Sequence, residues 1–465
     1  MSYLYLCDLI NDLSVLNNHI VTKITKDSRN VCLNAVFICE NIDYLLEGIN
    51  KGAKTIITNF DVINTYLDIN IIKQDNLKEV YQTLLKKFYQ NYQSPYLIGL
   101  TGTCGKTTTS TILYRVLKQK YNPLLIGSNG IYYQDNDIEI KHEINNTTPS
   151  LEIIYEFIYL KRFDYVIIEV SSQGLDDGRV EGLSFDLGVF LNLSSEHLDH
   201  HINMDNYFQS KLKLFKKIKE DGISLINSKL LFKEKFYQEV NSLILEFDDD
   251  IELINDDLEK MKIKIEDKYL STSLNGVFNL ENINAVNKIC EILKIDKNDL
   301  YNVLENDSII DGRNNLYKIN SRYYLIDFAH TEEEVKAILQ HLHIHKINRL
   351  LVVIGCGGDR DKLKRPKVGK YSSLYSDYVI YTKDENRSER TIDIIKDILK
   401  GVKSNNYKVI LSRFNAIKEI INYSIEEDII AIIGMGNDLY FVDELDQYVS
   451  DLEVIKLLNG GNINE

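Results

Sequence analysis

The sequence predicts an α/β protein in which helices cover both faces of parallel sheets. Short apolar runs from Tyr96 onward alternate with segments of helical period, and a second series of the same kind begins after Gly312. Such alternation is typical of parallel sheets. The 465 residues exceed what one hydrophobic core usually supports, so we expect two or three domains, with boundaries near residues 95 and 312.

The expected elements follow in order along the chain. The first part, to about Gln93, has short alternating segments at 35–39 and 54–58 and a helical pattern from Leu77 to Tyr89. In the central part we expect strands Tyr96–Leu100, Tyr165–Val170 and Asp186–Leu193, and helices Thr107–Lys118, Leu151–Tyr159 and Tyr207–Ile218. In the last part we expect helices between the strands Tyr323–Asp327, Arg349–Gly355, Asp377–Thr382 and Asp428–Gly434.

The composition excludes several classes of protein. With 44% hydrophobic and 26% charged residues it is that of an ordinary globular chain. The formal net charge of −15 argues against a sequence-independent grip on nucleic acid or on an anionic membrane surface. No apolar run has the length of a membrane span, and no basic region precedes an apolar core in the first residues, so we expect a cytoplasmic protein. The cysteines show neither metal-ligand spacing nor a disulfide framework, and we expect free, buried thiols.

The most informative segment is a glycine-rich turn that follows an apolar strand and leads into a helix. Gly102 and Gly105 allow a tight turn whose N–H groups face phosphate oxygens. Lys106 supplies a cation, and the Thr107 hydroxyl can hold Mg²⁺. The pattern predicts a nucleoside triphosphate site of the P-loop type. Its candidate residues are Gly102, Thr103, Gly105, Lys106, Thr107 and Thr108.

Two further polar segments follow central strands. Glu169 and Ser171 end one strand, and a carboxylate beside the phosphate loop at that edge of a parallel sheet can hold Mg²⁺. The alternative is a buried glutamate that pairs with a neighbouring arginine. His197 follows the next strand, with Lys211 a few turns later. His197 can ligate a metal or orient a phosphate, although a single histidine is more often structural.

A third polar segment gathers three histidines, in the run His341-Leu-His-Ile-His345. No carboxylate or cysteine joins it at ligand spacing, so we interpret it as a surface helix or strand. The segment therefore has no role in the predicted site.

Motifs shared with one enzyme family run in order along nearly the whole chain. Around the two central segments they are Glu169-Val-Ser-Ser, Arg179-Val, Val189-Phe-x-Asn-Leu193, His197-Leu-Asp199, Lys211 and Leu214-Phe215. Elsewhere they are Asp27-Ser-Arg29, Thr147-Thr-Pro149, Gly276-x-Phe-Asn-x-x-Asn282, Asp311-Gly-Arg313, Asp327-Phe-Ala-His-Thr331, the run from Gly355 to Pro366, and Arg387-Ser-Glu389. With these motifs the chain resembles the Mur ligases, and among them the UDP-N-acetylmuramoyl-tripeptide synthetases (MurE).

The resemblance implies a three-domain Mur ligase architecture. Residues 1–95 would receive a nucleotide-linked substrate, 96–312 would form a P-loop ATPase domain, and 313–465 a Rossmann-like domain that delivers an amino acid. In the family reaction ATP phosphorylates a carboxylate to an acyl phosphate, an amine attacks it through a tetrahedral intermediate, and phosphate leaves as an amide forms.

The resemblance also assigns roles around ATP. Lys106 would stabilise the transferring phosphoryl group. Two Mg²⁺ ions are expected, held by Thr107, Glu169, His197 and Lys211. Lys211 matches the family lysine that is carbamylated, because a neutral amine that captures CO₂ becomes an anion able to bind a second Mg²⁺. The alternative for Lys211 is an exposed helix lysine.

Nucleotide and substrate contacts are implied by the same motifs. Asn282, Arg313 and Asp327 match positions that contact adenine, phosphate and ribose, with Arg313 at a hinge that reaches ATP only on domain closure. The implied substrate residues are Ser28, Thr147, Thr148, Ser171, Arg179, Arg360, Asp384, Glu385, Arg387 and Asp438.

Three departures from the family pattern bear on the substrate. After the segment that ends at Cys39, MurE-like proteins carry a Gly-x(3)-Asp-Gly loop that helps shape the site for the uridine-linked sugar. This chain lacks that loop and continues directly to Asn41. The Asp-Asn-Pro-Arg motif of the diaminopimelate enzymes is Asp384-Glu-Asn-Arg387 here, and Gly-Lys-Gly-His-Glu is Gly434-Met-Gly-Asn-Asp438. The two additional acids favour a cationic side chain, such as that of lysine or ornithine, at least as much as diaminopimelate.

The predicted function is an ATP-dependent ligase that adds an amino acid to a UDP-N-acetylmuramoyl dipeptide in peptidoglycan precursor synthesis. One alternative is a Mur-type ligase that acts on a different carboxylate or peptide. Another is a non-catalytic nucleotide-binding protein of the same fold, which the intact set of candidate catalytic residues opposes: Lys106, Glu169, His197 and Lys211. We expect small-molecule substrates, no nucleic acid or membrane partner, and a monomer.

Overall fold

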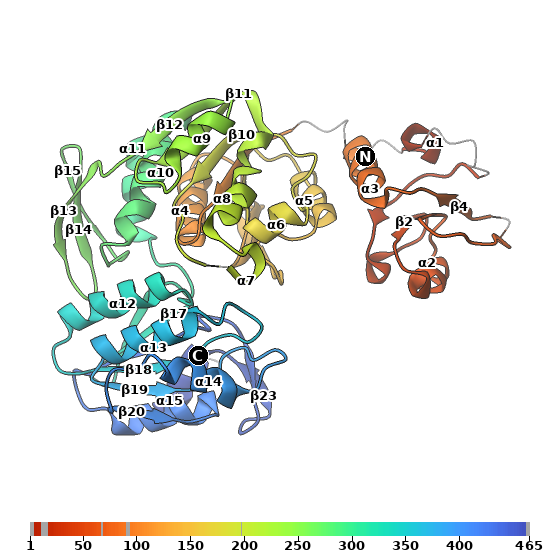
Figure 1. Cartoon of the computed structure of the whole chain (residues 1–465). Helices are drawn as coiled ribbons and strands as arrows, with labels where there is room; N and C mark the ends of the chain where they lie inside the picture. The colour runs from red at the N-terminus through yellow and green to blue at the C-terminus, as the bar shows by residue number, and fades with distance from the viewer. Residues whose placement is uncertain (1–3, 11–16, 67, 90–93, 197, 462–465) are drawn as a thin grey trace.

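Three successive parts of the chain each fold around a sheet with parallel strands (Figure 1). The computed structural model describes residues 4–10, 17–66, 68–89, 94–196 and 198–461. No helix in these described ranges is both long and apolar enough to cross a membrane. The cysteines are free thiols as predicted, and Cys39, Cys290 and Cys356 are buried as predicted. The prediction of burial is wrong for Cys7 and Cys32, which are exposed.

The N-terminal part is a four-stranded parallel sheet of order β1-β2-β3-β4. Its strands are β1 (Ile24–Thr25), β2 (Val36–Cys39), β3 (Thr55–Thr58) and β4 (Asn70–Lys73), with α1 (Leu6–Leu9), α2 (Leu45–Asn50), α3 (Leu77–Tyr89) and short 3₁₀ turns at Ser28–Asn30 and Ile42–Tyr44. The predicted segments at 35–39, 54–58 and 77–89 are confirmed. Leu84 and Leu85 of α3 belong to the same buried core as Ile154 of the central part, so the two parts share apolar contacts.

The central part is an eight-stranded sheet of order β12-β11-β10-β5-β9-β6-β7-β8. Its strands are β5 (Tyr96–Thr101), β6 (Pro123–Gly127), β7 (Gly130–Asp135), β8 (Ile138–His142), β9 (Tyr165–Glu169), β10 (Phe185–Phe190), β11 (Ile218–Asn227) and β12 (Leu243–Phe247). Six strands are parallel as predicted, whereas β7 and β8 add an antiparallel edge. Along β5, Leu97 packs on one face and Ile98 on the other, because successive strand residues point to opposite faces.

Helices cover both faces of the central sheet. They are α4 (Lys106–Lys118), α5 (Leu151–Ile158), α6 (Ser172–Asp176), α7 (Leu198–His201), α8 (Met204–Leu212), α9 (Lys233–Glu239), α10 (Asn279–Leu293) and α11 (Lys297–Asn306). The predicted helix Tyr207–Ile218 is wrong at its end, since α8 stops at Leu212 and β11 begins at Ile218. The apolar residues of β11 are drawn into parallel pairing with β10 and β12, and this tertiary pairing outweighs the local helical period.

A small antiparallel sheet connects the central part to the last one. It consists of β13 (Ile251–Asp256), β14 (Met261–Ile265) and β15 (Lys268–Thr272), and it projects toward α12 of the C-terminal part (Figure 1).

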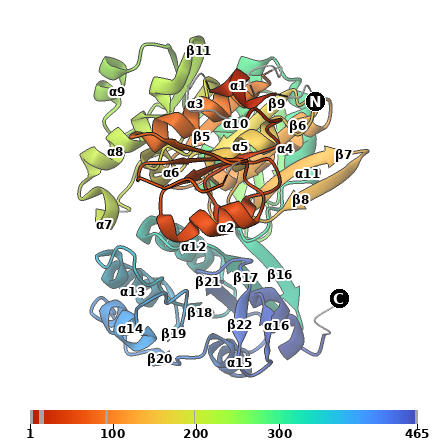
Figure 2. The ribbon, with the colours of Figure 1, turned by 90° about the vertical axis from the view of Figure 1, so that its right-hand side faces the viewer.

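The C-terminal part is a six-stranded sheet of order β16-β17-β21-β18-β19-β20. Its strands are β16 (Asn315–Ile319), β17 (Arg322–Asp327), β18 (Leu350–Ile354), β19 (Tyr378–Tyr381), β20 (Tyr407–Val409) and β21 (Ile429–Ile433), followed by the hairpin β22 (Tyr440–Val442) and β23 (Gln447–Val449). One face is covered by α12 (Glu332–His345), α13 (Lys364–Tyr375) and α14 (Thr391–Leu399), and the other by α15 (Arg413–Tyr423) and α16 (Asp451–Leu458). The predicted α/β class is confirmed, and α12 lies on the side that faces the central part in both views (Figures 1 and 2).

Candidate active site

The phosphate loop lies between β5 and α4, and its backbone requires glycine at one position. Gly105 has φ +80°, and a Cβ there would lie 2.1 Å from Oδ1 of Asn282. Lys106 folds back over the loop, and its Nζ donates to the carbonyl oxygens of Gly102 at 2.8 Å and Thr103 at 2.9 Å. Unpaired N–H groups in the first turn of α4 and the Lys106 ammonium together form a site for an anion.

Asn282 supports this loop from α10. It is buried, accepts a hydrogen bond from Oγ1 of Thr109 at 3.4 Å and donates to Asn279 at 3.0 Å. Thr103 and Thr108 are buried in the loop and in the first turn of α4. The structure therefore brings the predicted loop residues together, and the adenine contact of Asn282 stays a prediction.

Glu169 ends β9 beside the loop, surrounded by hydroxyl groups. Its side chain is buried and accepts hydrogen bonds from Thr107 at 3.1 Å, Ser110 at 3.0 Å and Ser128 at 3.0 Å. The partners of Glu169 are therefore hydroxyl groups, whereas the alternative prediction was a pair with a neighbouring arginine. A carboxylate among neutral hydroxyls has oxygens that suit Mg²⁺. Sequence reasoning missed Ser110 and Ser128, although Ser110 is one helical turn from Thr107.

The predicted substrate residues of the central part form one network next to Glu169. Oγ1 of Thr147 lies 3.0 Å from Oγ of Ser128, and Oγ1 of Thr148 donates to the Glu169 carbonyl at 2.9 Å. Ser171 lies 3.1 Å from the Thr148 hydroxyl and caps α6. Arg179 donates to the Thr148 carbonyl at 2.9 Å and pairs with Asp177 at 2.7 Å.

Lys211, on α8, is a buried amine pointing at the same loop. Only 1% of the residue is exposed, and Nζ donates to the Gly102 carbonyl at 2.8 Å. Nζ also lies 4.5 Å from the centre of the Tyr207 ring. Burial, followed by the charge of Lys106, lowers the pKa of Lys211 well below its ordinary value. The exposed helix lysine considered as the alternative is therefore wrong, because the side chain is buried.

His197 lies outside the described residues, but its neighbour Glu196 is described. The Glu196 carboxylate is buried and lies 3.0 Å from Nε2 of His330 and 4.0 Å from Nζ of Lys364. Although burial opposes protonation, the carboxylates of Glu196 and Glu334 raise the pKa of His330 above its ordinary value. This contact joins the central part to the C-terminal part. Sequence reasoning assigned no role to Glu196 or His330. The available signals were that Glu196 directly precedes His197 and that His330 lies inside the shared motif Asp327-Phe-Ala-His-Thr331.

The hinge residues reach the phosphate loop. Nη2 of Arg313 donates to Oγ1 of Thr107 at 3.3 Å, and its guanidinium lies 4.8 Å from the centre of the Phe328 ring. Asp327 ends β17 and accepts backbone N–H groups of Asn314 at 2.6 Å and Ala329 at 2.5 Å. Burial raises the pKa of Asp327 to about 6. In this structure Asp327 holds the hinge backbone, and its ribose contact stays a prediction.

The predicted amino-acid residues line one pocket at the carboxyl ends of the C-terminal strands. Besides Glu196, His330 and Lys364, the pocket is lined by Arg360, Asp384, Glu385, Arg387 and Asp438. Arg387 donates a hydrogen bond to Glu385 at 2.9 Å, so these two side chains pair in this structure. Burial, reinforced by Asp384 and Glu385, raises the pKa of Asp438 to about 6. The pocket thus offers both cationic and anionic groups to a zwitterionic ligand.

Ser28 lies apart from these residues, in the N-terminal sheet. It is buried in the turn Ser28–Asn30, where Asp27 caps the backbone and Nζ of Lys51 donates to the Ser28 carbonyl at 3.1 Å.

Comparison with known proteins decides the family. Residues 100–290 match the Mur ligase middle domain, and residues 312–436 match the Mur ligase glutamate ligase domain. The UDP-N-acetylmuramoyl-L-alanyl-D-glutamate--2,6-diaminopimelate ligase of Fusobacterium nucleatum is 33% identical over 440 residues, covering 90% of this chain and 89% of the relative. The chain belongs to the Mur ligase family. As a Mur ligase it is an ATP-dependent, ADP-forming enzyme that uses Mg²⁺.

Other relatives of this Mur ligase include the UDP-N-acetylmuramyl-tripeptide synthetase 2 of Oceanobacillus iheyensis, 32% identical with 90% of each chain covered. Among solved structures, a ligase named for diaminopimelate superposes with a TM-score of 0.60 at 23% identity, covering 95% of each chain. The MurF ligase of Thermotoga maritima in complex with ADP gives a TM-score of 0.65 at 18% identity, covering 88% of this chain and 93% of that one. These structures share its three-domain fold.

Proposed function

We propose that this Mur ligase joins a diamino acid to the free carboxylate of a UDP-N-acetylmuramoyl dipeptide, a step of peptidoglycan precursor synthesis. The observation that carries the proposal is the mixed charge of the amino-acid pocket, whose lining includes Arg360 and the acids Glu385 and Asp438. A carboxylate of the incoming amino acid would pair with an arginine, and the acids would face a second amino group. The names of the relatives support the acceptor.

The phosphate loop and its neighbours would carry out the ATP-dependent half of the reaction. Lys106 would meet the charge that develops on the transferring phosphoryl group, and Arg313 would add a second cation from the hinge. Mg²⁺ would be held by Thr107, Glu169 and His197, where it neutralises phosphate charge. The three hydroxyls around Glu169 and its buried position support this assignment.

Lys211 would be carbamylated. Its neutral Nζ attacks the carbon of CO₂, an N–C bond forms as one C–O π bond opens, and Nζ releases a proton. The product is an anion, so it can hold a second Mg²⁺, which an ammonium group at this position would repel. The burial of Lys211 and its lowered pKa support this step.

We propose three roles for the three parts, with boundaries near residues 95 and 312. Residues 1–95 would bind the nucleotide-linked acceptor through Ser28, 96–312 would bind ATP, and 313–465 would deliver the amino acid. Thr147, Thr148, Ser171 and Arg179 would face the acceptor, because they adjoin Glu169. The missing loop before Asn41 supports a second candidate, a ligase for another carboxylate.

An ADP-release assay tests the proposal. With UDP-N-acetylmuramoyl-L-alanyl-D-glutamate, we expect ADP to form only when an amine is added, and fastest with lysine, ornithine or diaminopimelate. Turnover with a different carboxylate, but none with this acceptor, would establish the second candidate. No turnover with any pair, despite ATP binding, would show a non-catalytic protein.

A further inference from the structure

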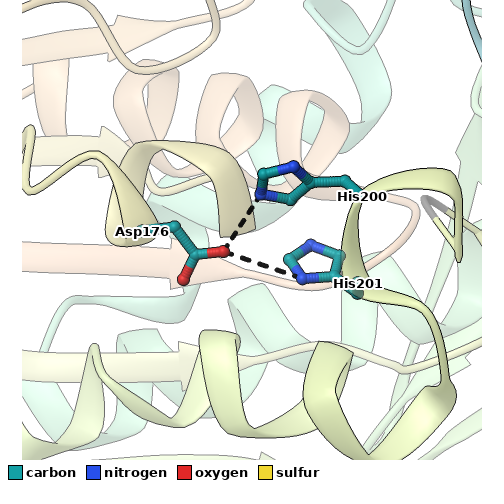
Figure 3. A group of neighbouring side chains, drawn as sticks. All are labelled: Asp176, His200 and His201. Carbon is teal, nitrogen blue, oxygen red and sulfur yellow. Dashed lines mark hydrogen bonds and ion pairs between the residues drawn. The ribbon is translucent and has the colours of Figure 1, made fainter.

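Two groups of one aspartate and two histidines bring potential metal ligands within 4.8 Å of one another in the part of the chain that the structure describes. The first is Asp176, His200 and His201 (Figure 3). In this group, Oδ1 of Asp176 already accepts hydrogen bonds from Nζ of Lys213 at 2.6 Å and from Oγ of Ser210 at 2.8 Å. Since an ammonium group on the same carboxylate repels a second cation, this group is a salt-bridge cluster.

The second group joins two parts of the molecule. Asp256 ends β13 of the small sheet, and His341 and His345 lie one turn apart at the end of α12. The carboxylate that the histidine segment lacks in sequence is thus supplied from 85 residues away. His341 is also buried, with 4% of its side chain exposed, so our interpretation of the segment as a surface element is wrong at this residue.

The distances within this group suit a small transition-metal ion. Nδ1 of His341 lies 3.1 Å from Oδ2 of Asp256, and Nε2 of His345 lies 3.9 Å from the same oxygen. In tetrahedral zinc sites, bonds of about 2.0–2.2 Å place neighbouring ligand atoms roughly 3.4 Å apart. The observed separations lie on either side of that value, so small rotations of the side chains would complete the site.

The charge around the group also favours a cation. Oδ1 of Asp256 accepts a hydrogen bond from the Gly276 N–H at 3.0 Å. Unlike the carboxylate of Asp176, that of Asp256 pairs with no lysine or arginine among the described residues, only with the two histidines. Nε2 of His341 is buried and has no hydrogen-bond partner among the described residues. The polar contact of this ring is therefore the one between its Nδ1 and Oδ2 of Asp256.

We propose that Asp256, His341 and His345 bind one Zn²⁺-like divalent ion that fastens the small sheet to α12. Two imidazoles and one carboxylate are ligands typical of zinc, with water as the fourth. The other end of α12 is capped by Thr331, which directly follows His330 of the amino-acid pocket. The ion would therefore hold the helix whose first turn borders that pocket.

Zinc binding is measured by competition with a chromophoric chelator, using metal-free full-length protein. We expect the wild type to bind one more equivalent of Zn²⁺ than either His345→Ala or Asp256→Asn. If a variant still binds Zn²⁺ weakly at this site, its affinity should be at least about tenfold lower than that of the wild type. Mutation of groups that only support metal ligands already lowers metal affinity by about this factor. Zn²⁺ should also raise the Tm of the wild type more than that of either variant.

Two control variants separate this site from others. His343→Ala removes an exposed histidine of the same helix, whose Nδ1 donates to the Tyr375 carbonyl at 2.8 Å, and His200→Ala removes a ligand of the first group. Both should bind as much zinc as the wild type. Equal stoichiometry in all four variants, or a loss only in His200→Ala, would overturn the proposal. His345 is partly exposed, so His345→Ala decides the matter if Asp256→Asn does not fold. These readouts do not depend on the ligase substrate.

Discussion

Two lysines share one carbonyl oxygen at the phosphate loop. Nζ of Lys106 and Nζ of Lys211 each lie 2.8 Å from the Gly102 carbonyl. Two ammonium groups so close repel each other, and burial makes the repulsion stronger. A carbamate on Lys211 would replace that repulsion with attraction, which gives a physical reason for the proposed modification.

Replacement of this lysine tests the modification. Lys211→Ala should lower kcat by on the order of a hundredfold or more, because the anion for the second Mg²⁺ is lost, while ATP affinity changes little. Bicarbonate or short carboxylates should restore part of the activity by supplying an anion. Lys213→Ala, which removes a half-exposed neighbour paired with Asp176, is the control and should remain active. Near-normal turnover in Lys211→Ala would contradict the role.

Glu385 is the residue on which amino-acid choice depends. It pairs with Arg387 at 2.9 Å, and its side chain is 62% exposed. Glu385→Lys should lower kcat/KM for a diamine substrate by roughly tenfold or more while sparing neutral amino acids. Glu419→Lys, at a surface acid paired with Lys408, controls for net charge. An equal change for both kinds of substrate would show that Glu385 does not face the side chain.

Among the elements, the phosphate loop was the easiest to predict, because its strand, glycines, lysine and helix are consecutive in sequence. The hydroxyl shell of Glu169 was harder, since Ser110 and Ser128 come from α4 and the end of β6 and only the sheet order brings them together. The partnership of Asp256 with His341 was missed for the same reason, because it joins segments 85 residues apart, which local periodicity does not encode. The antiparallel edge β7–β8 is a local hairpin and was missed for another reason, because its two-residue turn at Asn136 and Asp137 was not recognised.

Gly105→Ala tests whether the loop depends on its backbone and on Asn282. The residue has φ +80°, and the new methyl group would lie 2.1 Å from the Asn282 amide. We expect a loss of about 1–3 kcal/mol in the free energy of unfolding, and weaker ADP binding, because both the strain and the contact displace the loop. Thermal unfolding and calorimetric ADP titration measure these effects.

Gly460→Ala is the matched control. Gly460 has a similar φ of +89°, but no atom of the described residues lies within 4 Å of its added Cβ. It should therefore show the cost of backbone strain alone, about 1 kcal/mol. Equal losses in the two variants would show that Asn282 adapts and that the contact contributes nothing.

For the whole molecule, a few polar contacts between side chains of different parts join the three parts to one another. Arg313 joins the start of the C-terminal part to Thr107, and His330 joins the C-terminal part to Glu196. On the N-terminal side, the buried carboxylate of Glu152 accepts hydrogen bonds from the Thr25 hydroxyl at 3.0 Å and the Tyr81 hydroxyl at 2.9 Å. Under the proposed function, these contacts determine whether acceptor, ATP and amino acid meet.

Glu152→Ala should loosen the N-terminal part from the central one. It leaves two buried hydroxyls and the Lys26 N–H without their acceptor, a loss of about 2–5 kcal/mol at this contact. We expect faster proteolysis between the two parts, a larger radius of gyration in X-ray scattering, and a higher KM for the nucleotide-linked acceptor with ADP affinity unchanged. Glu156→Ala is the control on the same helix, because its bond to Lys23 is exposed and worth at most about 1 kcal/mol. If the acceptor KM stays at the wild-type value although scattering shows the expansion, the N-terminal sheet does not bind the acceptor, and the role proposed for residues 1–95 is wrong.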